Sequence, residues 1–202
     1  MNQALEDIKA IREMMEKSTK FISLSGLSGI IPGIIAIAGA AFAYFYLLKN
    51  QSLADFNQTQ ELMLLLAGAL IVLFLSMGFA IYFSWRKARK NQQVLFNKLT
   101  MKILYSMAIP LFAGGIFCLM LLMKGDISMA MAGTLIFYGL ALINVSKYTF
   151  NEVHYLGIAE IILGIIASIF TYYGLLFWAM GFGVCHIIYG IVMYKKYDLK
   201  KG

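Results

Sequence analysis

The chain has 202 residues, of which 61% are hydrophobic and only 13% are charged. Soluble domains carry about 25% charged residues, so the composition excludes an ordinary soluble globular protein. The formal net charge is +7 at neutral pH, but no recognition motif accompanies the basic residues, and we expect no nucleic-acid partner.

Six apolar windows are each long enough to cross a bilayer as a helix, which takes roughly 20 residues. They cover residues 21–48, 61–85, 103–123, 128–147, 155–172 and 175–194. The windows are continuously apolar, which favours helices over the alternating pattern of a β-barrel. The sequence therefore predicts an all-α, polytopic membrane protein with six transmembrane helices, and residues 21–195 form the transmembrane domain.

Residues 1–20 precede the first window and place Ile8, Ile11 and Met15 at helical spacing, opposite a charged face. This pattern predicts a cytoplasmic amphipathic helix that lies on the inner membrane surface. Residues 4–20 are alternatively a contact for a second copy of the chain or for a protein partner. A cleaved signal peptide is not expected, because acidic residues precede the apolar window.

The distribution of basic residues predicts the orientation of the chain. Fifteen of the 17 lysines and arginines fall on the side of the two termini, and only Lys49 and Lys124 fall on the other side. Basic segments stay in the cytoplasm, so we expect both termini there and a multi-pass location in the inner membrane, with residues 196–202 as a basic tail. In the second connection, a basic group is expected to attract membrane lipids with anionic headgroups. Its residues are Arg86, Lys87, Arg89 and Lys90.

Glu160 is a lone carboxylate in the fifth window, and His186 is a lone imidazole in the sixth. Both lie equally far from a predicted tight turn centred near Tyr173, so an antiparallel hairpin places them at equal depth. Each belongs to a stripe of small residues, and we expect the two stripes to pack together. Because an unpaired charge in hydrocarbon is costly, we predict that the Glu160 carboxylate lies within hydrogen-bond reach of the His186 ring.

More polar residues are expected near this pair. If the connection between the fourth and fifth windows is symmetric about Glu152, Asn144 lies at the depth of Glu160. Other polar residues lie at the same predicted membrane face. The candidate substrate- or proton-binding residues are Glu160, His186, Asn144, Lys147, Tyr148, Ser25 and Ser28.

No catalytic motif, metal-ligand set or cofactor motif is recognised in the sequence. Cys118 and Cys185 fall inside predicted spans, which makes a disulfide framework or zinc site unexpected. A haem held by His154 and His186 is disfavoured, because the helical rise separates the two residues by about 9 Å in depth.

The last hairpin has glycines seven residues apart, Gly157 with Gly164 and Gly183 with Gly190, and Gly26 with Gly33 repeat the spacing in the first window. In this pattern it resembles hairpins of the six-helix bacterial acid-resistance membrane proteins. The segments "EDIKAIREMMEKSTKFISLSGLSG" and "ALINVSKYTFNEVHYLG" also resemble those of uncharacterised bacterial six-helix inner-membrane proteins. The resemblance implies a bacterial inner-membrane location and transfers no activity.

Three interpretations of function stay open at this point. In the first, a buried Glu160–His186 cluster serves small-solute or proton-linked transport or sensing. In the second, the chain is a non-catalytic accessory or scaffold subunit of a membrane complex. In the third, it is an intramembrane enzyme that modifies lipid with Glu160 and His186 as acid–base partners, so enzymatic activity is undecided.

Overall fold

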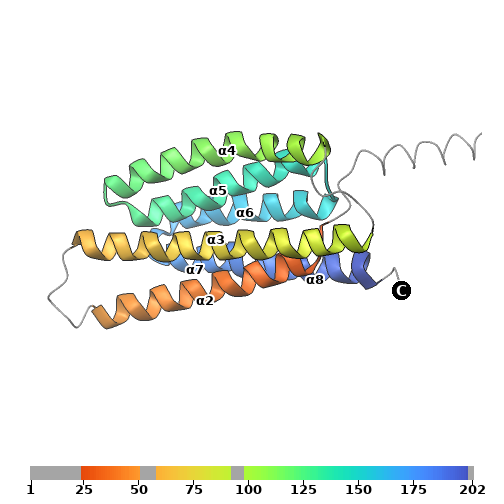
Figure 1. Cartoon of the computed structure of the whole chain (residues 1–202). Coiled ribbons are helices and arrows are strands. Elements are labelled where there is room, and N and C mark those ends of the chain that lie inside the picture. The colour runs from red at the N-terminus through yellow and green to blue at the C-terminus, as the bar shows by residue number, and fades with distance from the viewer. Residues whose placement is uncertain (1–23, 51–57, 92–97, 200–202) are drawn as a thin grey trace, which may run out of the picture.

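The computed structural model describes residues 24–50, 58–91 and 98–199. Within these ranges the protein is all-helical and contains six helices long and apolar enough to cross a membrane (Figure 1). The predicted fold class is therefore confirmed. The amphipathic helix predicted over residues 1–20 and the last residues of the basic tail lie outside the described part of the chain.

The helices match the predicted apolar windows to within six residues at each end. The first five are α2 (Leu27–Asn50), α3 (Gln58–Lys90), α4 (Lys98–Met123), α5 (Ile127–Ser146) and α6 (Asn151–Ile169). The sixth span is a continuous series of short helical segments. They are η1 (Thr171–Tyr173), α7 (Gly174–Trp178), the π-helical η2 (Ala179–Cys185), α8 (His186–Met193) and η3 (Tyr194–Asp198).

Local chemistry explains where α4, α5 and α6 end or begin. Gly125 has a φ of 80°, which suits glycine in the sharp turn after α4. Asp126 then accepts a hydrogen bond from the backbone N–H of Met129 at 3.2 Å and caps the start of α5. Phe150 is extended and opens α6 four residues earlier than the apolar window predicts, so the connection between α5 and α6 is tight.

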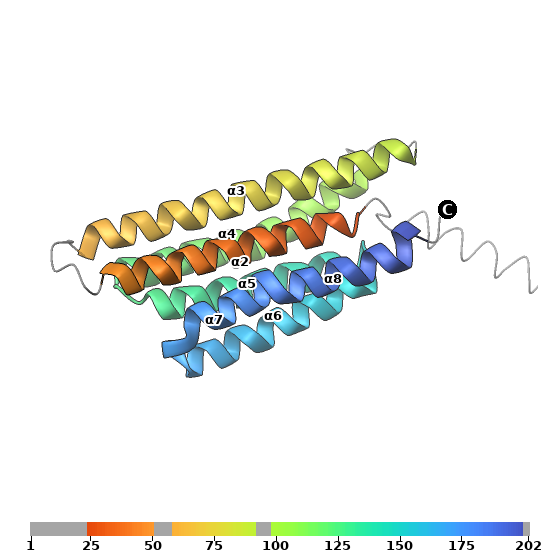
Figure 2. The same cartoon turned by 90° about the horizontal axis from the view of Figure 1, so that it is seen from below.

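The spans lie along one common axis, and both ends of the described chain lie at the same end of the bundle (Figures 1 and 2). Helix α5 packs against α4 and α6, whereas α2 packs against α3 and the sixth span. Gly139 of α5 and Gly157 of α6 each lie against the other's backbone carbonyl. Small residues permit such close approach between membrane helices.

The small-residue stripes of α6 and the sixth span do not pack on each other, so that prediction is wrong. Gly157 and Gly164 of α6 contact α5 instead. Gly183 and Gly190 of the sixth span contact α2. Each stripe packs against a helix that also has small residues, α5 or α2, so the two backbones approach closely there.

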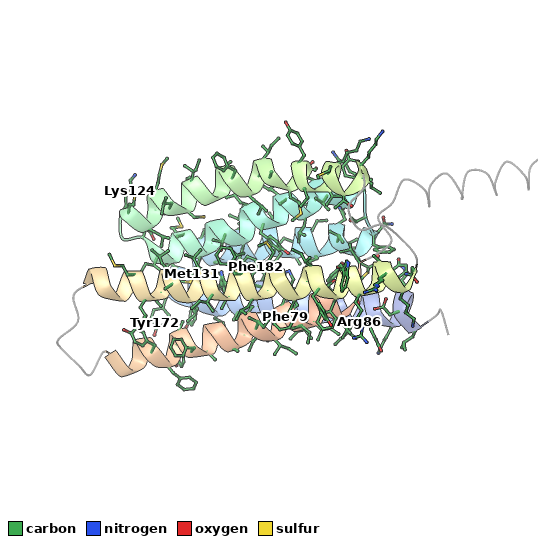
Figure 3. All side chains as sticks on the ribbon, in the orientation of Figure 1. Phe79, Arg86, Lys124, Met131, Tyr172 and Phe182 are labelled. Atoms are coloured by element: carbon green, nitrogen blue, oxygen red, sulfur yellow. The ribbon has the colours of Figure 1, made fainter. Side chains whose placement is uncertain are left out.

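Charges lie at the ends of the bundle and apolar side chains cover its sides. Arg86 lies near the end that holds both described termini, and Lys124 lies at the opposite end (Figure 3). Large apolar side chains such as Phe112, Phe74 and Leu73 are more than half exposed. This surface fits a multi-pass membrane protein, with both described ends on one side.

Candidate functional site

Glu160 lies at the centre of the bundle on the inner face of α6. Its side chain is 0% exposed. One carboxylate oxygen lies against the position that a Cβ on Gly181 would occupy, and the Leu135 side chain lies beside the same position. A carboxylate is thus enclosed by α5, α6 and η2, where a charge is expensive unless it is paired or neutralised.

The predicted Glu160–His186 contact is confirmed. Nδ1 of His186 lies 3.3 Å from Oε1 of Glu160. The same nitrogen lies 3.1 Å from the carbonyl oxygen of Gly181. Neither carboxylate oxygen has a hydrogen-bond partner among the described residues. The pair is therefore close enough for ionic contact, while the ring N–H is directed to the Gly181 carbonyl.

The reason predicted for this contact needs correction. The connection of the hairpin runs from Phe170, where the backbone leaves the helix, to Tyr173, so its centre lies before Tyr173. Glu160 and Gly181 are about equally far along the chain from this turn, so Gly181 faces Glu160. His186 reaches the carboxylate because its side chain leans toward the N-terminus of its helix and contacts the π-helical turn before it.

Tyr138 of α5 completes the site, and the sequence prediction missed it. Its hydroxyl lies 2.9 Å from Nε2 of His186. The two rings stack at a centroid distance of 5.5 Å, and Phe182 packs against both. Tyr138 reaches His186 because the Gly139–Gly157 contact fixes α5 against α6, and no spacing in the sequence reveals that contact.

Asn144 does not lie at the depth of Glu160, so that prediction is wrong. The contacts of Gly139 with Gly157, and of Gly164 with Ala132, set the register of α5 and α6. Asn144 is thus about 12 Å closer to the α5–α6 connection than Glu160, at the usual helical rise. Its side-chain amide donates to the Ser106 carbonyl of α4 at 3.0 Å.

Lys147 and Tyr148 follow the end of α5 in the α5–α6 connection. Lys147 is exposed and Tyr148 is half-buried. Both lie further from Glu160 along the bundle than Asn144 does, since the register of α5 on α6 continues toward the connection. The structure therefore does not bring them to the Glu160–His186 pair.

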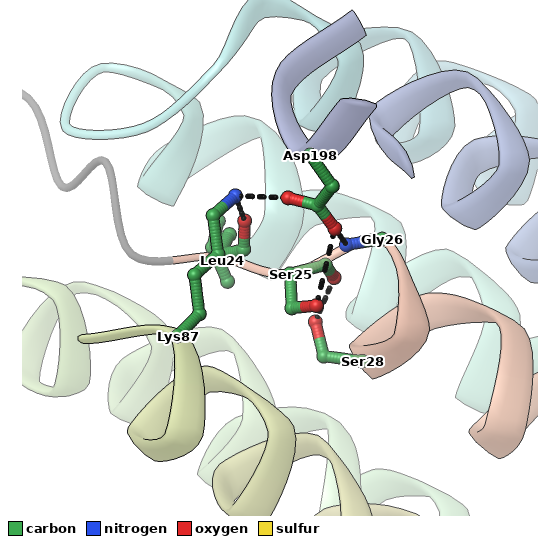
Figure 4. A network of polar contacts seen from close by, with 6 residues as sticks. All are labelled: Leu24, Ser25, Gly26, Ser28, Lys87 and Asp198. Carbon is green, nitrogen blue, oxygen red and sulfur yellow. Dashed lines mark hydrogen bonds and ion pairs between the residues drawn. The ribbon is translucent and has the colours of Figure 1, made fainter. Parts of the chain in front are cut away.

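Ser25 belongs to a separate polar network at the start of α2 (Figure 4). The Asp198 carboxylate forms an ion pair with Lys87 at 2.6 Å and accepts hydrogen bonds from the backbone N–H of Gly26 at 2.9 Å and from the Ser25 hydroxyl at 3.3 Å. Lys87 also donates to the Leu24 carbonyl at 2.6 Å. Asp198 thereby caps α2 and ties it to α3.

Ser28 donates to the Ser25 carbonyl in this same network. Asp198 lies three helical turns beyond His186, about 18 Å at the usual rise. Ser25 and Ser28 are thus grouped with Asp198 and not with Glu160. The prediction of one continuous polar cluster is replaced by a buried site in the middle of the bundle and a charged network at one end.

Glu152 and the last described residues form a second contact at this end. Lys196 pairs with Glu152 at 2.6 Å, and the Tyr197 hydroxyl donates to the same carboxylate at 3.2 Å. Lys87 is only 12% exposed and is engaged by Asp198. The prediction of anionic lipid headgroups therefore rests on the exposed residues Arg86, Arg89 and Lys90.

His154 lies apart from the central site, with Nδ1 3.4 Å from the Ser146 hydroxyl. Cys118 and Cys185 are free thiols. Among the residues that the structure describes, no group of three or more histidine, cysteine, aspartate or glutamate side chains is arranged to hold a metal ion.

No known protein family, curated protein or solved structure matches this chain. The chemistry of the central site therefore has to be derived from its geometry. The buried Glu160 carboxylate and the His186 imidazole can each accept a proton. The Tyr138 hydroxyl beside them carries a proton that can exchange. The arrangement suits reversible binding of a proton inside the bundle.

Proposed function

We propose that the protein is an integral membrane protein of the bacterial inner membrane whose Glu160–His186 pair binds and releases a proton. This proton binding would serve proton-linked or small-solute transport, or sensing. The observation that carries the proposal is the Glu160 carboxylate, which is 0% exposed and lies 3.3 Å from His186 Nδ1. Intramembrane ionisable groups generally mark proton or substrate pathways.

Two features favour a proton site over a contact that only holds helices together. A structural contact gains most when both partners are fully hydrogen-bonded, yet both Glu160 oxygens lack a hydrogen-bond partner among the described residues. The pair also adjoins the π-helical segment η2, and π-helical turns are frequent at functional sites. Both features cost stability, as functional sites commonly do.

Infrared difference spectroscopy on the full chain tests the proposal. Spectra of the protein in lipid nanodiscs are recorded at alkaline and at mildly acidic pH. We expect a protonation signal, either the carboxylic acid C=O stretch or the imidazolium ring band, that disappears in Glu160→Gln. The same signal should persist in Glu152→Gln, a matched control on the same helix. A wild-type spectrum without a Glu160-dependent signal would contradict the proposal.

Transport and sensing are separated by a second measurement. The protein is reconstituted into liposomes that contain a pH-sensitive dye, and the outer solution is acidified. Proton-linked transport gives a change of inner pH that requires Glu160. Sensing gives the infrared signal without a change of inner pH.

An accessory role in a membrane complex is the second candidate, and helix α3 favours it. Helix α3 packs against α2, and none of the residues in its most apolar stretch is buried. Either lipid or a partner helix can cover this long apolar surface. Native mass spectrometry of the protein extracted from its membrane tests this role. A bound partner subunit supports it, and a chain that carries only lipid contradicts it.

A further inference from the structure

Tyr138 contacts the ring nitrogen of His186 that Glu160 does not reach. Its hydroxyl is 2.9 Å from Nε2, whereas Glu160 and the Gly181 carbonyl approach Nδ1 at 3.3 Å and 3.1 Å. The imidazole therefore lies between a phenol and a carboxylate, with one ring nitrogen toward each. Histidine serves as a proton shuttle in many proteins.

The Gly181 carbonyl determines which nitrogen carries hydrogen. A carbonyl oxygen only accepts hydrogen bonds, so Nδ1, at 3.1 Å from it, carries the ring hydrogen. In the neutral ring, Nε2 is then the acceptor, and the Tyr138 hydroxyl donates to it. The hydroxyl proton is therefore directed at Nε2, the ring nitrogen that carries no proton in the neutral form.

Burial decreases from the carboxylate outward. Glu160 is 0% exposed, His186 is 7% exposed and Tyr138 is only half-buried. Tyr138 also packs, together with Leu24, against an apolar cluster near the α5–α6 connection. The Leu24 carbonyl accepts from Lys87 in the charged network (Figure 4). Tyr138 is therefore the least buried member of the site, and it borders an apolar cluster that Leu24 also borders.

We infer that Tyr138 is the outer residue of a proton relay that loads the Glu160–His186 pair. The inference rests on the proposed proton-binding function. During loading, the O–H bond of Tyr138 breaks and its proton forms a bond to Nε2. The phenolate oxygen takes its replacement proton from a hydronium ion of the acidified solution, which becomes water, so Tyr138 ends unchanged. The resulting imidazolium lies beside the Glu160 carboxylate, and the pair has gained one proton. Release runs through the same atoms in reverse.

Other titratable groups face the pair from the elements packed around it. These are Tyr138 on α5 and Cys185 at the end of η2, and Tyr189 on α8 lies near Tyr138. Helix α7 contributes no titratable side chain, and neither does α2 between Leu27 and Ala43. Among these groups, Tyr138 is hydrogen-bonded to the imidazole, which distinguishes it from Tyr189, one helical turn beyond His186.

Rapid-mixing infrared spectroscopy tests the relay. The full chain in nanodiscs is shifted from alkaline to mildly acidic pH, and the rate and final size of the Glu160-dependent signal are recorded. Tyr138→Phe keeps the ring and removes only the hydroxyl. We expect it to slow the signal about a hundredfold, which is within the contribution of a positioned proton-transfer group. The final size is recorded beside the rate, because the variant also removes the hydrogen bond between the hydroxyl and Nε2.

Tyr189→Phe is the matched control and should keep the wild-type rate. An unchanged rate in Tyr138→Phe, or equal slowing in both variants, would overturn the relay while leaving the proton-binding pair in place. A wild-type protein without any Glu160-dependent signal would overturn both proposals, so the two failures are distinguishable.

A second measurement covers the case in which Tyr138→Phe does not fold. The chain has two histidines, so His154→Gln leaves His186 as the sole source of imidazole signals in nitrogen-15 NMR. At alkaline pH we expect hydrogen on Nδ1 and a hydrogen-bonded acceptor at Nε2. Hydrogen on Nε2 instead would make Tyr138 an acceptor and would overturn the relay.

Discussion

A carboxylate oxygen of Glu160 occupies the space where a side chain on Gly181 would begin. The two residues come from opposite sides of the last hairpin, and the Gly181 carbonyl also accepts from His186 at 3.1 Å. Gly181 therefore has two roles that depend on close approach. It makes room for the carboxylate, and its carbonyl orients the imidazole.

Gly181→Ala should displace the Glu160 carboxylate, because a methyl group at this position collides with it and with Leu135. We expect the free energy of unfolding to fall by about 1–3 kcal/mol, as for other overpacked sites. Gly115→Ala on α4 is the control, since a Cβ there meets nothing within 4 Å. Thermal unfolding in detergent compares the two, and equal stability of both variants would show that the carboxylate moves without cost.

Glu160→Met should stabilise the protein. The sequence alone predicts a loss for an apolar replacement, because His186 would lose its partner. In the structure, Nδ1 keeps the Gly181 carbonyl as acceptor, while both Glu160 oxygens lack a hydrogen-bond partner among the described residues. Removing them should raise the free energy of unfolding by about 1–3 kcal/mol.

The matched control for that variant is Glu152→Met on the same helix. Glu152 has Lys196 at 2.6 Å and Tyr197 at 3.2 Å, so its replacement should lower stability. Thermal unfolding of both variants in the same detergent decides the matter. A marked loss of stability in Glu160→Met would identify the pair as a structural contact.

Asp198→Asn should destabilise the charged end of the bundle. The substitution removes the negative charge that Lys87 pairs with at 2.6 Å and weakens the cap on Gly26. Because Lys87 is only 12% exposed, we expect a loss of about 2–3 kcal/mol. Lys196→Gln, at a position that is 54% exposed, should lower stability far less, because solvent screens an exposed ion pair. Similar losses in the two variants would contradict the capping role of Asp198.

Single cysteines at Asp126 and Lys147 should be labelled from opposite sides of the membrane. The two residues flank α5, one of the six apolar helices. The distribution of basic residues predicts that position 147 faces the cytoplasm. Labelling of intact cells and of inverted vesicles with a membrane-impermeant thiol reagent, in a background that lacks Cys118 and Cys185, measures this. Labelling of position 126 from the cytoplasm would reverse the predicted topology.

The sequence predicts the spans well because each is a long apolar run, a signal that depends on composition alone. The Glu160–His186 contact was also predictable, since both groups need a partner in an apolar environment. It was harder to predict which residues of neighbouring helices lie at the same level in the bundle. The centre of the turn lies slightly before Tyr173 and a π-helical segment follows, so Gly181 and not His186 faces Glu160.

The contacts of Tyr138 and Asp198 could not be predicted from the sequence. Tyr138 reaches His186 through the packing of α5 on α6, which the contact between Gly139 and Gly157 fixes. Asp198 lies in a segment that reads as a basic tail, yet it caps a helix that begins 171 residues earlier, at Leu27, through the hydrogen bond to Gly26. Both contacts depend on which helices become neighbours, and hydropathy does not encode that.

The central claim is that Glu160 and His186 together bind an exchangeable proton. Difference potentiometric titration measures this most directly, by counting the protons that the purified protein takes up between alkaline and mildly acidic pH. Wild-type protein should take up one proton more than Glu160→Gln, because without the carboxylate a buried imidazolium has no counter-charge. Equal proton uptake by the two proteins would contradict the account.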